Sequence, residues 1–577
     1  MNLFTVGDYY INRIANFQSK PSDTSIQEKS RVKALILDND TLSTISMCTT
    51  QTELLKHEIY LVDKLENIHR DAMPHLKCLC YLKPTEDTIQ DLLHELQDPK
   101  YGEYQIFFNN QVSKSQLERL AERDDMEVVA HVEEIFQDYL IVNEDVFTLE
   151  IPLYNLLQNQ LVWDPKGLQE TSNGLISLLL SLKLNPTIAY DSNSKLCQKL
   201  AKDLEYEIKT NERQLFDFPV RDSNPLLILL DRKSDPLTPL LQPWTYQSMI
   251  NEYIGIKRNL VDLSNVPNID PDLKQVVLSS KQDKFFKETM YMNFGDLADK
   301  VKNYVTQYKN KTNITKQINT IEDIKEFIEK FPEFKKLSGN ISKHMAIVSE
   351  LDRQLQLKNI WEVSELEQNL SSHDDNNDDF VELKRILHLP TLESYYKLKL
   401  CCIFVLRHGK NESKVSELEN ILRQQCDPTQ ISLYFQFKQR FGSVFNKHKA
   451  PQDNDLISGL TKKFNRLGST SAENVFMQHV PELTVLLSDL DKNKFPQEGV
   501  TLSNQNIDPK TYMPQDVVIL IVGGLTIEEA RAVHQFNEKQ SKNKDNCRVV
   551  IGGTSIISTE QFLTDVCAVN DKPVDLL

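Results

Sequence analysis

The chain alternates between strand-like and helix-like patterns near both ends, whereas its middle is almost entirely helix-like. Before residue 150, short apolar runs predict strands at Val32–Asp38, Ile59–Val62, Lys77–Leu82 and Tyr104–Phe108. Between them, apolar residues have helical spacing at Thr85–Leu96 and Ser113–Asp124. Strands separated by helices favour a doubly wound, mostly parallel sheet. We therefore expect an N-terminal α/β domain over residues 1–131.

This alternation stops near Pro243 and returns close to the C-terminus. Further strands are predicted at Thr187–Tyr190, Leu226–Asp231, Val517–Val522 and Arg548–Ile551. Residues 243–470 instead show the apolar spacing of amphipathic helices. We expect a second doubly wound α/β domain, residues 132–240 and 475–577, into which a mainly helical domain, residues 241–474, is inserted. The fold class is thus α/β plus α.

Length and charge narrow the class of protein. With 577 residues the chain is too long for one hydrophobic core, and usual domain sizes predict about three or four domains. The net charge of −17 argues against a general nucleic-acid binder, because an acidic surface repels phosphate backbones. No run approaches the roughly 18 apolar residues that span a bilayer, and the nine cysteines are scattered, which favours a reducing compartment. We expect a cytoplasmic protein whose membrane association comes through a partner.

Positive signals for catalysis are weak. The chain has no G-x-x-x-x-G-K-[ST] loop, no G-x-G-x-x-G after the early strands and no G-x-S-x-G elbow. Two glycine pairs, 523–524 and 552–553, follow predicted strands, where open sheets bind ligands. A nucleotide- or phosphate-utilising enzyme that uses these turns is the alternative function. Otherwise the glycines permit tight turns and close packing.

Two short segments could suggest a metal. Cys78 and Cys80 form a Cys-x-Cys pair, which a strand places on one buried apolar face, and no partner Cys-x-x-Cys or His-x-x-x-His supplies the further ligands that zinc needs. The segment His373–Phe380 reads HDDNNDDF but lacks the turn glycine and closing glutamate of a calcium loop. We expect no metal, no cofactor and no catalytic residues.

The segment Asp231–Tyr246, which reads DRKSDPLTPLLQPWTY, is the most distinctive in the chain. Asp231 and Asp235 flank Arg232 at spacings that permit a local network of ion pairs and hydrogen bonds. Three prolines exclude a continuous helix and stiffen the path, and apolar residues anchor it on neighbouring cores. We expect a rigid joint between domains. The residues that identify it are Asp231, Arg232, Asp235, Thr238, Pro239 and Trp244.

This segment resembles the signature of the Sec/Munc (SM) family of SNARE regulators, in which a strand runs into Asp-Arg, a further Asp and then Thr-Pro-Leu-Leu. Other motifs resemble the family in the same order along the chain: Tyr81–Thr85, Phe331–Phe334, Ser342–His344, Glu473–Val475, Val522–Gly524 and Ile551–Thr554. The run Pro243–Gln247 looks closest to the vacuolar-protein-sorting branch, which serves fusion at the trans-Golgi network and endosomes. An SM protein is expected to be arch-shaped, with three domains.

The resemblance implies a binding protein. Domain one and a helical hairpin at about residues 296–348 would face each other across a cleft that holds a syntaxin-type SNARE. The protein would stabilise this SNARE, bind its assembled SNARE complex and promote fusion in vacuolar protein sorting, as a monomer on Golgi, endosome and vesicle membranes. The implied cleft residues are Asp63, Pro332, Met345 and Val348. Pro332 is expected to break the helix where the hairpin bends.

The resemblance also implies a pocket on the outer side of domain one for the short N-terminal peptide of the syntaxin. Its expected lining residues are Leu117, Leu120, Ala121, Val128 and Val129. The first three are spaced i, i+3 and i+4 and so share one face of the predicted helix. The alternative is that these residues simply pack the helix on the sheet. Leu117 is the preferred partner contact.

Overall fold

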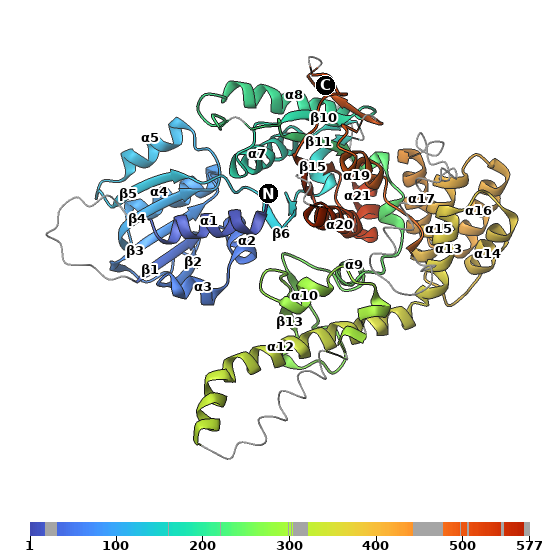
Figure 1. Cartoon of the computed structure of the whole chain (residues 1–577), viewed down its shortest axis with the longest axis horizontal. Helices are drawn as coiled ribbons and strands as arrows, with labels where there is room; N and C mark the ends of the chain where they lie inside the picture. Colours follow the sequence, from blue (N-terminus) through green and yellow to red (C-terminus); the bar gives the residue numbers. More distant parts are fainter. Residues whose placement is uncertain are drawn as a thin grey trace.

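The computed structural model describes residues 1–17, 32–159, 161–219, 221–297, 299–301, 303, 321–441, 477–496, 498–504, 507–543 and 547–570. Figure 1 shows a first sheet with its helices on the left, a second sheet in the centre and a group of helices on the right. The long helix α12 (Ile321–Leu357) runs below the centre and leads to the helices on the right. The predicted fold class is confirmed: an arch of two α/β units and a mainly helical unit.

The first sheet has five parallel strands in the order β2-β1-β3-β4-β5. Its strands are β1 (Lys33–Leu37), β2 (Ile59–Lys64), β3 (Met73–Leu82), β4 (Tyr101–Phe108) and β5 (Val129–Glu134). The helices of this unit are α1 (Leu3–Ala15), α2 (Asn39–Cys48), α3 (Gln51–Lys56), α4 (Glu86–Gln97) and α5 (Lys114–Arg123). Each strand and helix predicted here is present, with bounds shifted by a few residues.

Two hydrophobic cores lie on opposite faces of the first sheet. Along β1, Ile36 packs in the core that includes α4 and α5, whereas Leu35 packs in the core that includes α1 and α2. Cys78 and Cys80 are both buried in the first of these cores, as expected for one face of a strand. The other core continues into the next unit, where it contains Leu175. The first two units are therefore packed together by shared apolar contacts.

The second sheet has seven strands in the order β14-β10-β11-β15-β16-β7-β6. They are β6 (Leu140–Asn143), β7 (Val146–Thr148), β10 (Thr187–Asp191), β11 (Leu226–Asp231), β14 (Val500–Leu502), β15 (Asp516–Val522) and β16 (Arg548–Gly553). Since β15 and β16 lie between β11 and β7, strands from the C-terminal part complete a sheet that begins at β6. The sheet is not wholly parallel. Its outermost strands β14 and β6 are antiparallel to their neighbours. For β6 the reason is local, because the two-residue link from β6 to β7 is too short for a crossover.

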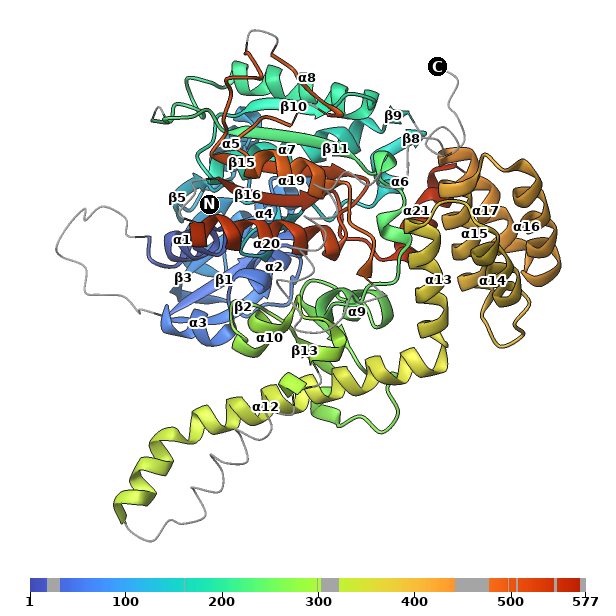
Figure 2. The ribbon, with the colours of Figure 1, turned by 45° about the vertical axis from the view of Figure 1, so that its right-hand side comes forward.

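Helices cover both faces of the second sheet (Figure 2). On one face lie α7 (Pro165–Ser181) and α8 (Lys195–Thr210), and on the other lie α19 (Leu483–Asp491) and α20 (Ile527–Asn543). The remaining elements are α6 (Leu153–Leu156), β8 (Leu157–Asn159), β9 (Val162–Trp163) and α21 (Thr559–Asn570). At the start of α20, Glu529 N–H donates to Thr526 Oγ1 at 3.3 Å and Thr526 N–H donates to Glu529 Oε2 at 3.0 Å, a capping box.

Between β11 and α19 the chain builds the helical unit. Its short elements are η1 (Arg232–Ser234), η2 (Thr238–Leu240), α9 (Tyr246–Tyr253), β12 (Leu260–Asp262), η3 (Pro271–Leu273), β13 (Gln275–Val277) and α10 (Lys284–Thr289). After α12 follow α13 (Ile360–Ser372), α14 (Asn377–Leu387), α15 (Ser394–His408), α16 (Glu412–Gln425) and α17 (Pro428–Phe441). One large hydrophobic core joins these elements to α21.

Helix α12 corrects one expectation. It is continuous over 37 residues and passes through Pro332, which was expected to break it. Proline removes one backbone hydrogen bond and bends a helix, but the bonds on either side hold the remaining turns. The first arm of the expected hairpin, at residues 304–320, lies outside the described residues, and so does the motif Glu473–Val475.

Candidate functional site

The joint segment, Asp231–Tyr246, connects the second sheet to the helical unit. Arg232 is buried, and its guanidinium donates two hydrogen bonds of 2.8 Å each to the carboxylate of Glu529 on α20. Bidentate guanidinium–carboxylate pairs combine charge with fixed geometry. Burial is the largest single influence and by itself lowers the pKa of Arg232, but the charge and hydrogen bonds of Glu529, together with the charges of nearby acidic groups such as Asp235, raise the pKa overall. The pair ties the end of β11 to the first turn of α20.

The two aspartates beside Arg232 have different partners. Asp235 lies 3.6 Å from the guanidinium and also accepts hydrogen bonds from the backbone N–H (3.0 Å) and the hydroxyl (2.6 Å) of Thr238. Asp231 instead accepts a hydrogen bond of 2.6 Å from Ser194, which caps α8. The predicted local network is thus present around Asp235. The bidentate partner of Arg232, however, is 297 residues away in the sequence.

The other end of the joint segment is anchored in the helical unit. Trp244 is buried, its Nε1 donates to Ser364 Oγ on α13 at 2.6 Å, and its ring centroid lies 4.4 Å from that of Trp361. Between the two ends, the carbonyl of Pro239 accepts a hydrogen bond of 2.8 Å from Thr559 on α21. Contacts with both units therefore hold the segment along its length, which is the arrangement of a rigid joint.

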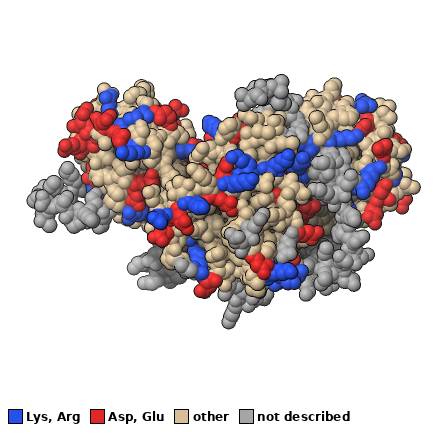
Figure 3. Space-filling view, turned by 90° about the horizontal axis from the view of Figure 1, so that it is seen from above, with Lys and Arg blue, Asp and Glu red and all other residues tan. Residues whose placement is uncertain are grey.

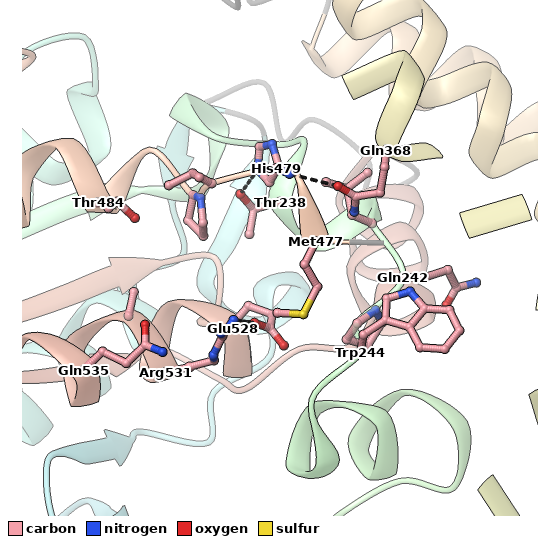
Figure 4. A pocket seen from close by; sticks show the side chains of 15 residues that line it. Thr238, Gln242, Trp244, Gln368, Met477, His479, Thr484, Glu528, Arg531 and Gln535 are labelled. Atoms are coloured by element: carbon pink, nitrogen blue, oxygen red, sulfur yellow. Dashed lines mark hydrogen bonds and ion pairs between the residues drawn. The ribbon is translucent and has the colours of Figure 1, made fainter. Parts of the chain in front are cut away.

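A cavity of about 90 Å³ lies beside the joint segment (Figure 4). Its labelled side chains come from the joint segment, α13, residues 477–484 and α20. Thr238 Oγ1 lies 3.0 Å from His479 Nε2, and the backbone N–H of His479 donates to Gln368 at 2.8 Å. Ligand pockets usually measure roughly 300–1,000 Å³. The cavity is therefore too small for a nucleotide.

Side chains fill the space at the glycine turns that an enzyme would use. A Cβ on Gly523 would lie 2.8 Å from the Cβ of Arg232, and a Cβ on Gly552 would lie 2.4 Å from the ring of Phe147. Gly523 also has a φ of +99°, which side chains other than glycine rarely adopt. These glycines permit close packing. The alternative function as a nucleotide- or phosphate-utilising enzyme is not supported.

Domain one exposes apolar residues on the side where the peptide pocket was expected. Leu117 on α5 is 39 % exposed, and Ala121, one turn later, is also exposed. Met126, which follows α5, is 64 % exposed, and Val132 on β5 is exposed as well. We name these four residues the outer patch. Apolar side chains gathered at a surface are typical of a protein-binding site.

Alternation along β5 explains why Val132 belongs to the outer patch. His131 stacks on Phe17 with ring centroids 3.8 Å apart, and Glu133 forms an ion pair of 3.0 Å with α1, so both side chains face α1. Val132 lies between them and points to the opposite face, which carries α4 and α5. The sequence prediction missed Val132 and Met126. An apolar residue between two polar ones was a usable signal for Val132, whereas Met126 lies in a turn without periodicity.

The other expected pocket residues are less accessible. Leu120 is 5 % exposed and packs in the core beneath α4 and α5, so the packing explanation holds for it. Val128 and Val129 are half-buried at the edge of the same core. Residues three apart on a helix differ by about 60° in direction. A helix that lies on a sheet can therefore bury Leu120 while it exposes Leu117.

The opposite edge of the first sheet also exposes large apolar side chains. We name this set the β2 edge: Leu55, Tyr60, Leu61, Val62 and Ile68. β2 is the outermost strand on this side, and Ile68, just beyond it, is 75 % exposed. Asp63 belongs to the same strand, and its carboxylate accepts a hydrogen bond of 3.0 Å from Asn67. Outermost strands with exposed apolar residues readily contact other chains.

The two remaining cleft residues lie on α12. Met345 is exposed, and Val348 is half-buried against the helical core. Figures 1 and 2 both place α10 between the first sheet and α12. The β2 edge and the exposed face of α12 therefore belong to separate units, with α10 between them.

Charge is unevenly distributed over the surface. Seen from above, the lobe of domain one carries both signs, whereas Lys and Arg form a band over the centre (Figure 3). Helix α8 contributes the exposed lysines Lys195, Lys199, Lys202 and Lys209. Within the described ranges, no helix is long and apolar enough to cross a membrane, and no three His, Cys, Asp or Glu residues form a possible metal site.

The Sec1 family model matches residues 33–565. This chain belongs to the Sec1 family. It is 54 % identical to vacuolar protein sorting-associated protein 45 of Saccharomyces cerevisiae, over 98 % of this chain and 99 % of that protein. It is 38 % identical to the protein of the same name from Schizosaccharomyces pombe, over 98 % and 99 % of the two chains.

A solved SM protein has the same architecture as this chain. The SM protein Vps45, in complex with the Qa SNARE Tlg2 (1-310), superposes with a TM-score of 0.87 at 38 % identity, over 100 % of this chain and 99 % of that one. The predicted resemblance to the SM family, and to its vacuolar-protein-sorting branch, is confirmed.

Proposed function

We propose that this Sec1-family protein binds a syntaxin-type SNARE, stabilises it and promotes SNARE assembly for vesicle fusion at the trans-Golgi network and endosomes, in support of vacuolar protein sorting. The observation that carries this proposal is the similarity along the whole chain to an SM protein solved with a Qa SNARE. The outer patch and the β2 edge supply two exposed apolar surfaces for such a partner. The protein acts by binding its partners, including the assembled SNARE complex, and not by catalysis.

The outer patch takes the N-terminal peptide of the syntaxin. Leu117 is the central contact, because it is an exposed leucine on α5, the helix that precedes β5. Val128 and Val129 form the half-buried floor beside it. A short peptide with one or two apolar anchors buries such side chains without any change in the core beneath them.

The β2 edge, Asp63 and α12 hold the helical part of the SNARE. Residues 1–131 then act as one side of the cleft, residues 241–474 act as the other side, and residues 132–240 with 475–577 form the base. Met345 and Val348 contribute from α12, and Pro332 lies earlier in the same helix, towards its N-terminus. The protein works as a monomer in the cytoplasm and reaches Golgi, endosome and vesicle membranes through its partner.

The variant Leu117→Arg tests the peptide site. It places a charge where an apolar anchor binds, so we expect the affinity for a syntaxin N-terminal peptide, measured by calorimetry, to fall at least about tenfold, or 1.4 kcal/mol. Val381→Arg is the matched control, since Val381 is an exposed apolar residue on α14, outside both surfaces. Both variants should have the melting temperature of the parent protein. A peptide affinity unchanged by Leu117→Arg would refute the pocket assignment.

A further inference from the structure

One short turn in the helical unit contacts all three parts of the molecule. We name Ser279–Asp283 the interdomain turn. It lies between β13 and α10, and it is closed by the backbone N–H groups of Gln282 and Asp283, which donate to the carbonyl of Ser279 at 3.2 and 2.9 Å. Such a closed turn gives the side chains between its ends defined directions.

Lys281 reaches from this turn to domain one. Its ammonium donates to the carboxylate of Asp8 on α1 at 2.5 Å and to the carbonyl of Cys48 at 2.7 Å, and it lies 6.0 Å from the ring centroid of Phe4. Cys48 is the last residue of α2, so its carbonyl has no partner within the helix. A cation is also favoured at that end by the helix dipole.

Ser280 reaches from the same turn to the second sheet. Its hydroxyl donates to Asn143 Oδ1 on β6 at 3.0 Å. The amide of Asn143 in turn donates to the hydroxyl of Tyr291 at 3.0 Å. Both Ser280 and Asn143 are buried, and a buried hydrogen bond of this kind is costly to break. The turn is therefore held on the second unit as well as on the first.

Asp283 connects the turn to α12. Its carboxylate accepts from Lys343 at 2.6 Å and lies 2.9 Å from Nε2 of the buried His344, whose Nδ1 lies 2.8 Å from the hydroxyl of Tyr246. Burial outweighs the attraction of Asp283 and lowers the pKa of His344. A neutral ring that donates from Nε2 to Asp283 and accepts at Nδ1 from Tyr246 satisfies all three groups.

We propose that the interdomain turn sets the spacing between domain one and α12, and that Lys281 is the positioning residue that holds domain one at this spacing. A single residue lies between Lys281, which binds α1 and α2, and Asp283, which binds the interior of α12. A shift of domain one therefore pulls on α12 through one short, hydrogen-bonded turn. The spacing of the two surfaces proposed to hold the SNARE is fixed in this way before any partner binds.

The direct test measures this spacing in the free, full-length protein. Spin labels on unnatural amino acids at Gln90 of α4 and Gln356 of α12, both exposed, report the distance distribution by double electron–electron resonance. We expect Lys281→Met to broaden or shift this distribution. Lys284→Met is the matched control, because Lys284 is an exposed lysine of α10 whose ion pair is with Glu288 in the same helix.

A second variant distinguishes the loss of this contact from misfolding. Asp8 is 56 % exposed in its side chain, so Asp8→Asn should fold normally and produce a smaller change in the same direction as Lys281→Met. The proposal is overturned if Lys281→Met has the distance distribution of the parent protein while its melting temperature is unchanged. It is also overturned if Lys284→Met broadens the distribution equally.

A binding measurement extends the test and rests on the proposed function. Lys281→Met should weaken binding of a syntaxin cytoplasmic region at least about fivefold, the lower end of typical couplings between sites. Affinity for the isolated N-terminal peptide should stay within about twofold, since the outer patch does not include the turn. Loss of both affinities would place the effect in the fold of domain one and overturn the role of Lys281. A protein that binds no syntaxin at all would refute the proposed function and leave the distance result standing.

Discussion

The buried pair between Arg232 and Glu529 leads to a quantitative prediction. The variant Glu529→Gln replaces the carboxylate with an amide of the same shape, and α20 keeps its capping box because glutamine also serves at this position. The change therefore removes the charge of residue 529 while the cap of α20 is retained. Removing one partner of a buried ion pair costs about 3–5 kcal/mol, because the other charge is left buried. Since Asp235 remains 3.6 Å from the guanidinium, we expect a loss of about 3 kcal/mol, at the lower end of this range.

The loss of stability in Glu529→Gln should be measured locally, in the elements around the pair. A chain with several hydrophobic cores does not unfold in two states, whereas amide hydrogen exchange in α20 and β15 reports the local opening free energy. Glu382→Gln is the control, because Glu382 pairs with Arg385 at the exposed surface of α14, where ion pairs contribute little. Adding Arg232→Met to Glu529→Gln should restore part of the stability, since no charge is then left buried. A loss below about 1 kcal/mol in Glu529→Gln would refute the role assigned to the pair.

Two further predictions concern packing and pH. In Gly552→Ala a methyl group would lie 2.4 Å from the ring of Phe147, so we expect a loss of about 1–3 kcal/mol and a lower melting temperature. An unchanged melting temperature would contradict the packing explanation for this glycine. His534 lies 3.5 Å from buried Asp145, and although burial opposes it, this carboxylate raises the pKa of His534. The contribution of this pair to the stability of the fold is therefore complete below the pKa of His534 in the unfolded chain, about 6.5. It is lost as the pH rises above that value and through the pKa of His534 in the folded protein. His534→Gln should flatten this decline in melting curves, and a pH profile that keeps its slope would count against the pairing.

Short-range patterns predicted most of the secondary structure. The shared strand face of Cys78 and Cys80 is present as predicted, because residues two positions apart lie on the same face of a strand. The joint segment was recognised for the same reason, since its prolines and its local hydrogen bonds lie within a few residues of each other. Pro332 marks the limit of such rules, because a proline bends a helix but need not end it.

Contacts between units were decided only by the tertiary structure. Nothing in the sequence relates Arg232 to Glu529, and only the sheet order, with β15 next to β11, brings them together. Likewise, helical spacing placed Leu117 and Leu120 on one face, but the position of α5 on the sheet determined which of them is exposed. By itself the sequence determined the family, the order of the elements and the place of the joint. The structure decided which residues meet, because periodicity describes distances along a helix or strand, whereas the partners of Arg232 and Lys281 depend on the path of the chain over 297 and 273 residues.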